Sequence, residues 1–123
     1  MAKVLIVDDA AIMRINIKKM LEKMGHEVIS EAENGFVAID KYKLLHPDFV
    51  TMDITMPSVN DVHDGIDATT EIVKYDNQAK IIMVTSHGEQ DKVIRAIQNG
   101  ASNYILKPIK YEKLEEAVNK LLN

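Results

Sequence analysis

Side chains suited to phosphoryl chemistry stand at four places where a short apolar run ends. They are Asp8 and Asp9, Asp53, Thr85, and Lys107. Carboxylates brought together repel one another and raise one another's pKa unless a divalent cation or a lysine compensates. Oxygen ligands without histidine or cysteine favour magnesium, whereas calcium usually takes more protein oxygens. If these groups meet, they predict a magnesium-dependent phosphoryl-transfer site.

One carboxylate of such a site can act as a nucleophile toward phosphorus and give an acyl phosphate. A lysine ammonium and a threonine hydroxyl can each bind a phosphoryl oxygen, so that catalysis is mainly positioning and charge neutralisation. Each residue taken alone has a plainer interpretation: an aspartate pair that caps a turn, an ordinary strand threonine, a solvated lysine. Their joint placement at strand ends is what favours a site.

Five short apolar or alternating runs predict β-strands, and the segments between them have the spacing of amphipathic helices. The expected strands are Lys3–Val7, His26–Ala32, Phe49–Met52, Ile81–Thr85 and Asn103–Leu106, with the second and the last as weaker, edge candidates. The first helix has an apolar face of Met13, Ile17, Met20, Leu21 and Met24 and ends before Gly25. The other helices are expected at Phe36–Leu45, Ile66–Tyr75, Asp91–Asn99 and Tyr111–Leu122.

This alternation predicts parallel β-α-β units, whose right-handed crossovers place helices on both faces of one sheet. The fold class is therefore α/β, a doubly wound sandwich of five strands and five helices. The length of 123 residues suits a single domain over residues 1–123. In such folds functional groups collect in the crevice outside the carboxyl ends of the strands, so the four polar strand ends are expected to meet there.

The composition excludes several classes of function. The formal net charge is -4 and the basic residues are scattered, which argues against direct binding of nucleic acid. No apolar run approaches the roughly 20 residues that span a bilayer, so neither a membrane segment nor a signal peptide is expected and a cytoplasmic location follows. The chain has 0 cysteines, which excludes disulfides, thiolate metal sites and a cysteine nucleophile.

Four motifs in this order and spacing resemble the response-regulator receiver family, most closely its stand-alone CheY-like regulators. They are VLIVDD at Val4–Asp9, MDITMP at Met52–Pro57, MVTS at Met83–Ser86 and ILKP at Ile105–Pro108. The resemblance covers essentially the whole chain. It implies a flavodoxin-like receiver fold with strand order 2-1-3-4-5. It also implies a phosphoprotein of two-component phosphorelay signalling, with self-phosphotransfer and slow autodephosphorylation as its only catalysis.

The resemblance also assigns roles to residues. Asp53 would accept a phosphoryl group from a sensor histidine kinase or a phosphotransfer protein. Asp9, Asp53 and the main-chain carbonyl of Thr55 would ligate Mg²⁺, and Asp8 would act through a metal-bound water. Lys107 would pair with the phosphoryl group.

Further roles concern switching. Thr85 would reach the phosphoryl group on activation, and Tyr104 would follow as a rotamer switch, although a strand aromatic that never moves is the plainer alternative. Pro108 would follow a cis peptide bond. His87 stands where the family tunes hydrolysis of the acyl phosphate, or it simply faces solvent on a loop.

Partners follow from the same resemblance. A downstream protein would bind the surface of the fourth helix, fifth strand and fifth helix. A monomer is expected, with a phosphorylation-dependent dimer as the alternative. Chemotaxis, a sporulation-type relay and other phosphorelays would all use the same pocket.

The segment Ser58–Asp64 departs from the family pattern, in which a turn follows the third strand sooner. Either Asp64-Gly65 or Asn60-Asp61 stands in the turn position. The added Asp61, His63 and Asp64 would supply a further metal ligand or a kinase-selectivity loop, or the segment is a surface insertion that costs little loop-closure entropy.

Two isoleucines, Ile12 and Ile15, lie off the apolar face of the first helix. They would be exposed and contact the four-helix dimerisation bundle of a histidine kinase, or that apolar face is wider than expected.

Two other functions compete with the signalling switch. A magnesium-dependent aspartyl-phosphate phosphatase would need a second carboxylate two residues after the nucleophile, where this chain has Thr55. A receiver-like binding module without phosphorylation would have lost site residues that are all present here. The chain is also expected to be a stand-alone protein, with a fragment of a longer DNA-binding regulator as the alternative.

Overall fold

The structure is a computed structural model that describes all of residues 1–123, and its centre is one parallel five-stranded sheet. The strands are β1 (Lys3–Val7), β2 (Glu27–Ala32), β3 (Phe49–Asp53), β4 (Ile81–Thr85) and β5 (Asn103–Leu106). Their order across the sheet is β2-β1-β3-β4-β5, and each neighbouring pair is parallel. The predicted order 2-1-3-4-5 and the two edge strands are confirmed.

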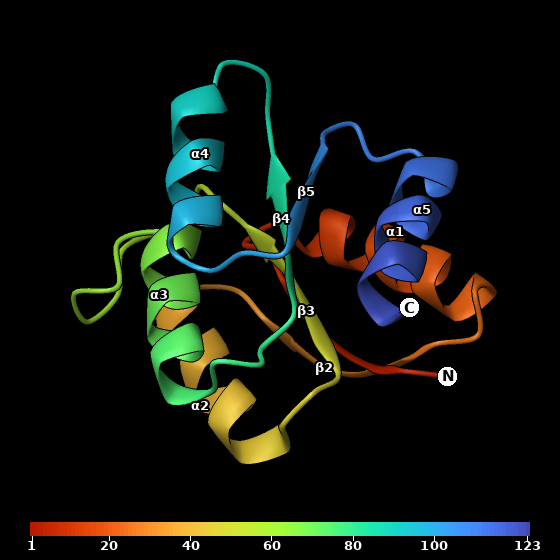
Figure 1. Cartoon of the computed structure of the whole chain (residues 1–123), viewed down its shortest axis with the longest axis horizontal. Helices are drawn as coiled ribbons and strands as arrows, with labels where there is room; N and C mark the ends of the chain where they lie inside the picture. The colour runs from red at the N-terminus through yellow and green to blue at the C-terminus, as the bar shows by residue number, and fades with distance from the viewer.

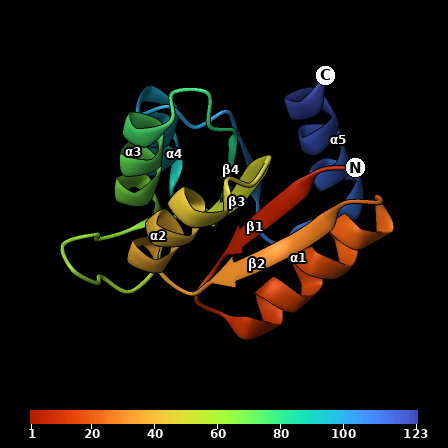
Figure 2. The ribbon, with the colours of Figure 1, turned by 90° about the horizontal axis from the view of Figure 1, so that it is seen from below.

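Five helices cover the two faces of this sheet (Figure 1). They are α1 (Ala11–Lys23), α2 (Gly35–Leu45), α3 (Gly65–Tyr75), α4 (Gln90–Gln98) and α5 (Tyr111–Leu122). Helices α1 and α5 lie on one face, whereas α2, α3 and α4 lie on the other (Figure 2). The doubly wound α/β sandwich expected from the alternation of elements is confirmed. No helix is both long and apolar enough to cross a bilayer.

The three inner strands contribute side chains to two hydrophobic cores, one on each face of the sheet. Along β1, Leu5 and Val7 pack under α2, α3 and α4, whereas Val4 and Ile6 pack against α1 and α5. Strands β3 and β4 alternate in the same way because successive side chains of a strand point to opposite faces. This double burial explains the continuous apolar runs in the sequence.

Element boundaries differ from the predicted ones by a single residue at several ends. Strand β3 extends to Asp53, β2 begins at Glu27, and α4 ends at Gln98 with Asn99 as its cap. Helix α2 begins one residue earlier than expected because the side chain of Asn34 accepts a hydrogen bond from the Val37 amide and caps the helix. The extension of β3 makes Asp53 the last residue of that strand, and the other differences leave the site residues at the strand ends.

The segment Ser58–Asp64 forms a small hairpin that projects beside α2 and α3 (Figure 2). Val59 and Val62 form an isolated antiparallel bridge, and Asn60 and Asp61 between them have positive φ values of 48° and 64°. Asparagine and aspartate tolerate this conformation better than most residues. Val62 is buried in the core on the helix α2 and α3 side.

Gly65 decides which residues occupy the turn before α3. Its amide donates a hydrogen bond of 2.8 Å to the Ile54 carbonyl, and α3 begins at this glycine. A Cβ atom here would lie 2.0 Å from the carbonyl oxygen of Asp53, so only glycine fits without displacement. Asp64-Gly65 therefore stands in the turn position, and the alternative placement of Asn60-Asp61 there is wrong.

Candidate functional site

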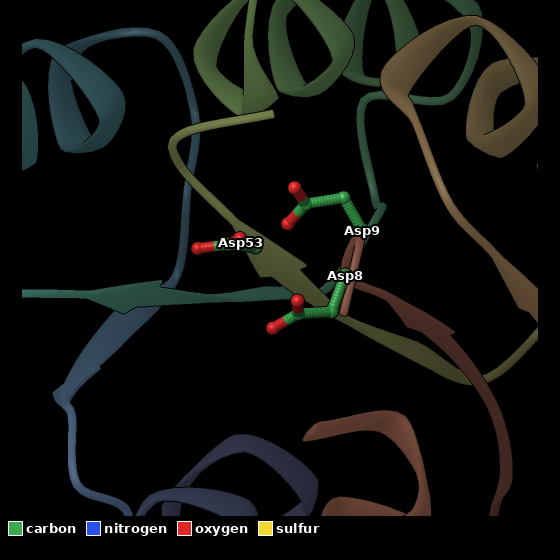
Figure 3. Close-up of side chains that lie close together, drawn as sticks. All are labelled: Asp8, Asp9 and Asp53. Atoms are coloured by element: carbon green, nitrogen blue, oxygen red, sulfur yellow. The ribbon is translucent and has the colours of Figure 1, made fainter. Parts of the chain in front are cut away.

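Three carboxylates meet where β1 and β3 end (Figure 3). Asp8 and Asp9 directly follow β1, and Asp53 is the last residue of β3. One oxygen from each of the three side chains lies within 4.8 Å of the others. Asp8 is 0% and Asp53 5% exposed, whereas Asp9 faces solvent. Two of the three carboxylates are thus removed from water. Their charges repel each other more strongly in the protein interior than they would in solvent.

Lys107 supplies the only basic group that contacts these carboxylates. It follows β5, and its Nζ atom lies 3.3 Å from Oδ2 of Asp8 and 3.4 Å from Oδ1 of Asp53. The charges of Asp53 and Asp8 raise the pKa of Lys107, although burial alone would lower it. The next peptide bond, Lys107–Pro108, is cis. The plainer interpretation of Lys107 as a solvated surface charge is wrong.

Burial and the neighbouring charge of Asp8 raise the pKa of Asp53 to about 7, against the opposing effect of Lys107. One lysine therefore does not compensate for the desolvation of this carboxyl group. Oδ1 of Asp8 accepts a hydrogen bond of 2.9 Å from the Ala10 amide, whereas the buried Oδ2 accepts none and has only the Lys107 ammonium at 3.3 Å. Groups that are buried without full hydrogen bonding destabilise the fold unless a further partner binds them.

The donor set fits a hard divalent cation. All three side chains offer carboxylate oxygens, and no histidine shares the cluster. The carbonyl oxygen of Thr55, two residues beyond Asp53, accepts no hydrogen bond from the protein. Magnesium takes ligands of this kind and usually keeps several waters, which suits a cluster with one exposed member. The residues present therefore fit the ion that the sequence predicts.

Arg14 on α1 supports the backbone beneath this cluster. Its Nη1 group donates a hydrogen bond of 2.8 Å to the Asp8 carbonyl, and its Nε group lies 2.9 Å from Oε1 of Glu31. Arg14 lies off the apolar face of Met13, Ile17, Met20, Leu21 and Met24, so the helical spacing alone gives it no role. Its contact with Asp8 depends on how α1 docks on the sheet, and the spacing of residues in the sequence does not reveal it.

Thr85 ends β4 beside the cluster and is 2% exposed. Its hydroxyl donates a hydrogen bond of 3.1 Å to Oε1 of Glu89. The same carboxylate accepts hydrogen bonds from the Ser86 amide at 2.7 Å and from the Thr55 hydroxyl at 2.6 Å. Glu89 thus links the loop after β3 to the loop after β4. Nothing in the local sequence pattern predicts this link.

The remaining predicted residues lie on the surface near the fourth and fifth strands. Tyr104 on β5 is 50% exposed and borders a groove of about 400 Å³ between α4 and β5. Its side chain is therefore outside the core and borders the same groove as Thr85. His87 is exposed, which favours its interpretation as a solvent-facing loop residue.

The hairpin does not add ligands to the carboxylate cluster. Asp64 caps α3 by accepting a hydrogen bond of 2.9 Å from the Asp67 amide. The Nδ1 atom of His63 lies 3.0 Å from the Ser58 hydroxyl, and Asp61 is at the exposed turn. The expectation of a further metal ligand from this segment is therefore not met, whereas a kinase-selectivity role or a tolerated insertion stays a prediction.

On α1, Ile12 and Ile15 are 64% and 46% exposed, close to Asp9 in the sequence. The alternative of a wider buried face on this helix is wrong. Large apolar side chains in water at this place are available for contact with another protein.

Replacing Lys107 by methionine is expected to destabilise the fold by about 2 kcal/mol at pH 8, because it leaves two buried carboxylates without their cation. The pKa of Asp53 should rise further, since Lys107 opposes that rise. Urea unfolding in EDTA measures the effect, which should be smaller at pH 6, where Asp53 binds a proton. Lys113→Met, at an exposed lysine without an ion pair, is the matched control. Equal losses in the two variants would contradict the prediction.

Comparison with known proteins gives a consistent result. Residues 4–119 match the family model described as response regulator receiver domain. The chemotaxis protein CheY of Bacillus subtilis is 54% identical over 98% of each chain, and that of Thermotoga maritima is 52% identical over 97% of this chain and 96% of its own. The solved CheX-CheY-BeF3-Mg+2 complex from Borrelia burgdorferi contains a chain that is 32% identical, with a TM-score of 0.91 over 98% of this chain and 89% of that chain.

Proposed function

The chain belongs to the response regulator receiver domain family, and we propose that Asp53 is its phosphorylated residue. Signalling through a phosphorylated aspartate is the general function of this family. The observation that carries the assignment is the buried Asp53 carboxylate, which lies beside Asp8 and Asp9 and 3.4 Å from Lys107. We further propose that residues 1–123 form a single receiver domain.

The donor we propose is the phosphohistidine of a sensor histidine kinase or of a phosphotransfer protein. An oxygen of Asp53 attacks the phosphorus atom and forms the new O–P bond. The N–P bond breaks, and its electron pair stays with the histidine ring, which takes up a proton. Lys107, already beside Asp53, binds a phosphoryl oxygen and offsets the added negative charge.

For magnesium, we propose Asp9, Asp53 and the Thr55 carbonyl as direct ligands and Asp8 as a residue that acts through a bound water. The raised pKa of Asp53 supports this assignment, as does the buried Oδ2 of Asp8, which has the Lys107 ion pair but accepts no hydrogen bond. When bound, the ion supplies neutralisation of the negative charge on the phosphoryl oxygens. Asp8 meanwhile holds Lys107 in place through its ion pair of 3.3 Å.

The switch we propose begins at Thr85. Its hydroxyl moves to a phosphoryl oxygen, and Tyr104 follows into the groove between α4 and β5 that both residues border. The surface of α4, β5 and α5 then changes its affinity for a downstream protein. Exposed Leu106 and Ile97 in this groove give such a partner apolar contacts.

A role in chemotaxis is our proposal for the process that the chain serves, because the CheY relatives cover nearly its whole length. We propose that the protein acts as a monomer that meets its kinase through Ile12 and Ile15. A magnesium-dependent phosphatase is the weaker alternative. The position two residues after Asp53 carries Thr55, which lacks the carboxylate that such enzymes use as acid and base.

Incubation with acetyl phosphate and magnesium tests the proposal. Intact mass spectrometry should show one added phosphoryl group, and peptide mapping should place it on the segment that contains Asp53. EDTA should prevent the reaction because the carboxylate cluster then lacks its cation. Modification at another segment, or a reaction of equal rate in EDTA, would refute the assignment.

A further inference from the structure

The carboxylate of Glu89 joins two loops at the edge of the phosphorylation site. Its hydrogen bonds with Thr55, Thr85 and Ser86 are called the clasp below. Glu89 lies just before α4, and its side chain is only 16% exposed. It accepts hydrogen bonds from the hydroxyls of Thr55 and Thr85 and from the Ser86 amide. These hydrogen bonds therefore join the loop after β3 to the loop after β4 through one carboxylate.

The clasp holds the hydroxyl that the switch requires. A threonine hydroxyl has one proton and donates one hydrogen bond at a time. The Ser86 carbonyl lies 3.4 Å from the Thr85 hydroxyl, but Oε1 of Glu89 at 3.1 Å is the nearer acceptor. While the proton points to Glu89, Thr85 has none to give to a phosphoryl oxygen on Asp53. The two hydrogen bonds are mutually exclusive, so phosphorylation has to break one to make the other.

The charge of Glu89 acts in the same direction. A phosphoryl group on Asp53 carries up to two negative charges in place of the one on the carboxylate, and an anionic side chain held next to Thr85 repels it. Lys92, one turn along α4, lies 3.7 Å from Oε2 of Glu89. It offers the carboxylate a partner once the hydroxyl of Thr85 leaves. When Thr85 leaves, the Glu89 carboxylate therefore still has a positively charged partner.

We propose that Glu89 is a positioning residue that holds Thr85 away from Asp53 in the unphosphorylated protein and so opposes activation of the switch. This rests on the proposed function of Asp53 and Thr85. Glu89 sets how much of the phosphoryl binding energy is needed to move the threonine. It acts through Thr85 and does not itself contact the reacting atoms.

Beryllofluoride with magnesium is a suitable probe because it mimics the phosphoryl group without a covalent step. Its affinity, measured by fluorine NMR titration at fixed magnesium, should rise about tenfold in Glu89→Ala, the equivalent of one charge-assisted hydrogen bond no longer broken. Glu89→Gln keeps a neutral acceptor for the hydroxyl and should give an intermediate increase. Asp91→Asn removes an exposed acid from the first turn of α4 without touching the clasp and should leave the affinity unchanged.

Coupling to Thr85 separates this role from a general loosening of the loop. In a Thr85→Ala background, adding Glu89→Ala should change the beryllofluoride affinity less than about twofold, because no hydroxyl remains to be released. A Glu89→Ala protein that binds the probe no more tightly than wild type, or a gain that survives in the Thr85→Ala background, would overturn the proposal. Loss of fold in the loop would weaken binding, which is the opposite sign.

The same titration distinguishes failure of the clasp from failure of the proposed function. Wild-type protein that binds no beryllofluoride at saturating magnesium would overturn both proposals together. Wild-type binding with an unchanged Glu89→Ala affinity would overturn only the clasp and leave the role of Asp53 intact.

Discussion

An Asp53→Asn variant is expected to accept no phosphoryl group and yet to be more stable than the wild-type protein. The amide has no anionic oxygen to attack phosphorus, so acetyl phosphate should leave its mass unchanged. The same substitution removes one of two buried carboxylates that repel each other. Asp8 and Lys107 then remain as a neutral pair 3.3 Å apart.

The gain in stability should depend on pH. The pKa of Asp53 is raised from 3.8 to about 7 in the folded protein. Below pH 4 the carboxyl group of Asp53 is protonated in both the folded and the unfolded chain, so it does not lower the free energy of unfolding. Between pH 4 and 7 only the folded chain holds the proton, and stability falls as pH rises. Above pH 7 the cost is constant, at about 2 to 4 kcal/mol, which the asparagine avoids.

Urea unfolding of both proteins in EDTA, at pH 5 and pH 8, measures this effect. The difference should be largest at pH 8 and should shrink when magnesium is added, because the ion stabilises the wild-type cluster more than the variant. Asp40→Asn, at an exposed acid on α2 without a polar partner, is the control and should change little. A variant that is less stable than wild type at pH 8 would show that Asp53 is not strained by its surroundings.

Gly65→Ala is expected to displace the backbone of the site and to lower the free energy of unfolding by about 3 kcal/mol. The new Cβ atom would lie 2.0 Å from the Asp53 carbonyl oxygen and 3.0 Å from Cγ of Met52. Neither group can yield easily, since both belong to β3, which is buried on both faces. The backbone of Asp53 or the start of α3 must shift, and magnesium affinity should fall with it.

Gly25→Ala is the matched control for the Gly65 prediction. Gly25 has a positive φ of 93°, but a Cβ atom added there would have no neighbour within 4 Å, so only the backbone conformation is penalised. Its loss should be about 1 kcal/mol, with magnesium affinity unchanged. Urea unfolding and magnesium titration on the three proteins measure both quantities. Equal losses at the two glycines would remove the claim that crowding against Asp53 matters.

Much of the fold follows from the sequence because the inner strands are buried on both faces. Val4–Val7 and Ile81–Val84 are short, continuous apolar runs rich in β-branched residues. Such runs are typical of buried strands and not of amphipathic helices. Once β1, β3 and β4 are parallel neighbours, the residues after them must meet at one edge. The proximity of Asp8, Asp9 and Asp53 was therefore predictable from the order of residues alone.

The parts of the site that were not predictable depend on long-range packing. Glu89 reaches Thr55 from the loop after β4, in which Gly88 has a positive φ of 89°. Arg14 reaches the Asp8 carbonyl only through the docking of α1. The choice between the two turn positions required the contact of Gly65 with Asp53. Spacing along the chain carries none of this information.

The hairpin at Val59–Val62 has a practical consequence for engineering. Val62 is buried in the core, whereas the turn at Asn60 and Asp61 is exposed and contributes no ligand to the carboxylate cluster. Exposed turns of this kind accept inserted sequence well. A fluorophore attached through a single cysteine at Asn60 would label the protein uniquely, since the chain has 0 cysteines of its own. Such a reporter would follow binding of a partner protein without occupying either the carboxylate cluster or the groove beside Tyr104.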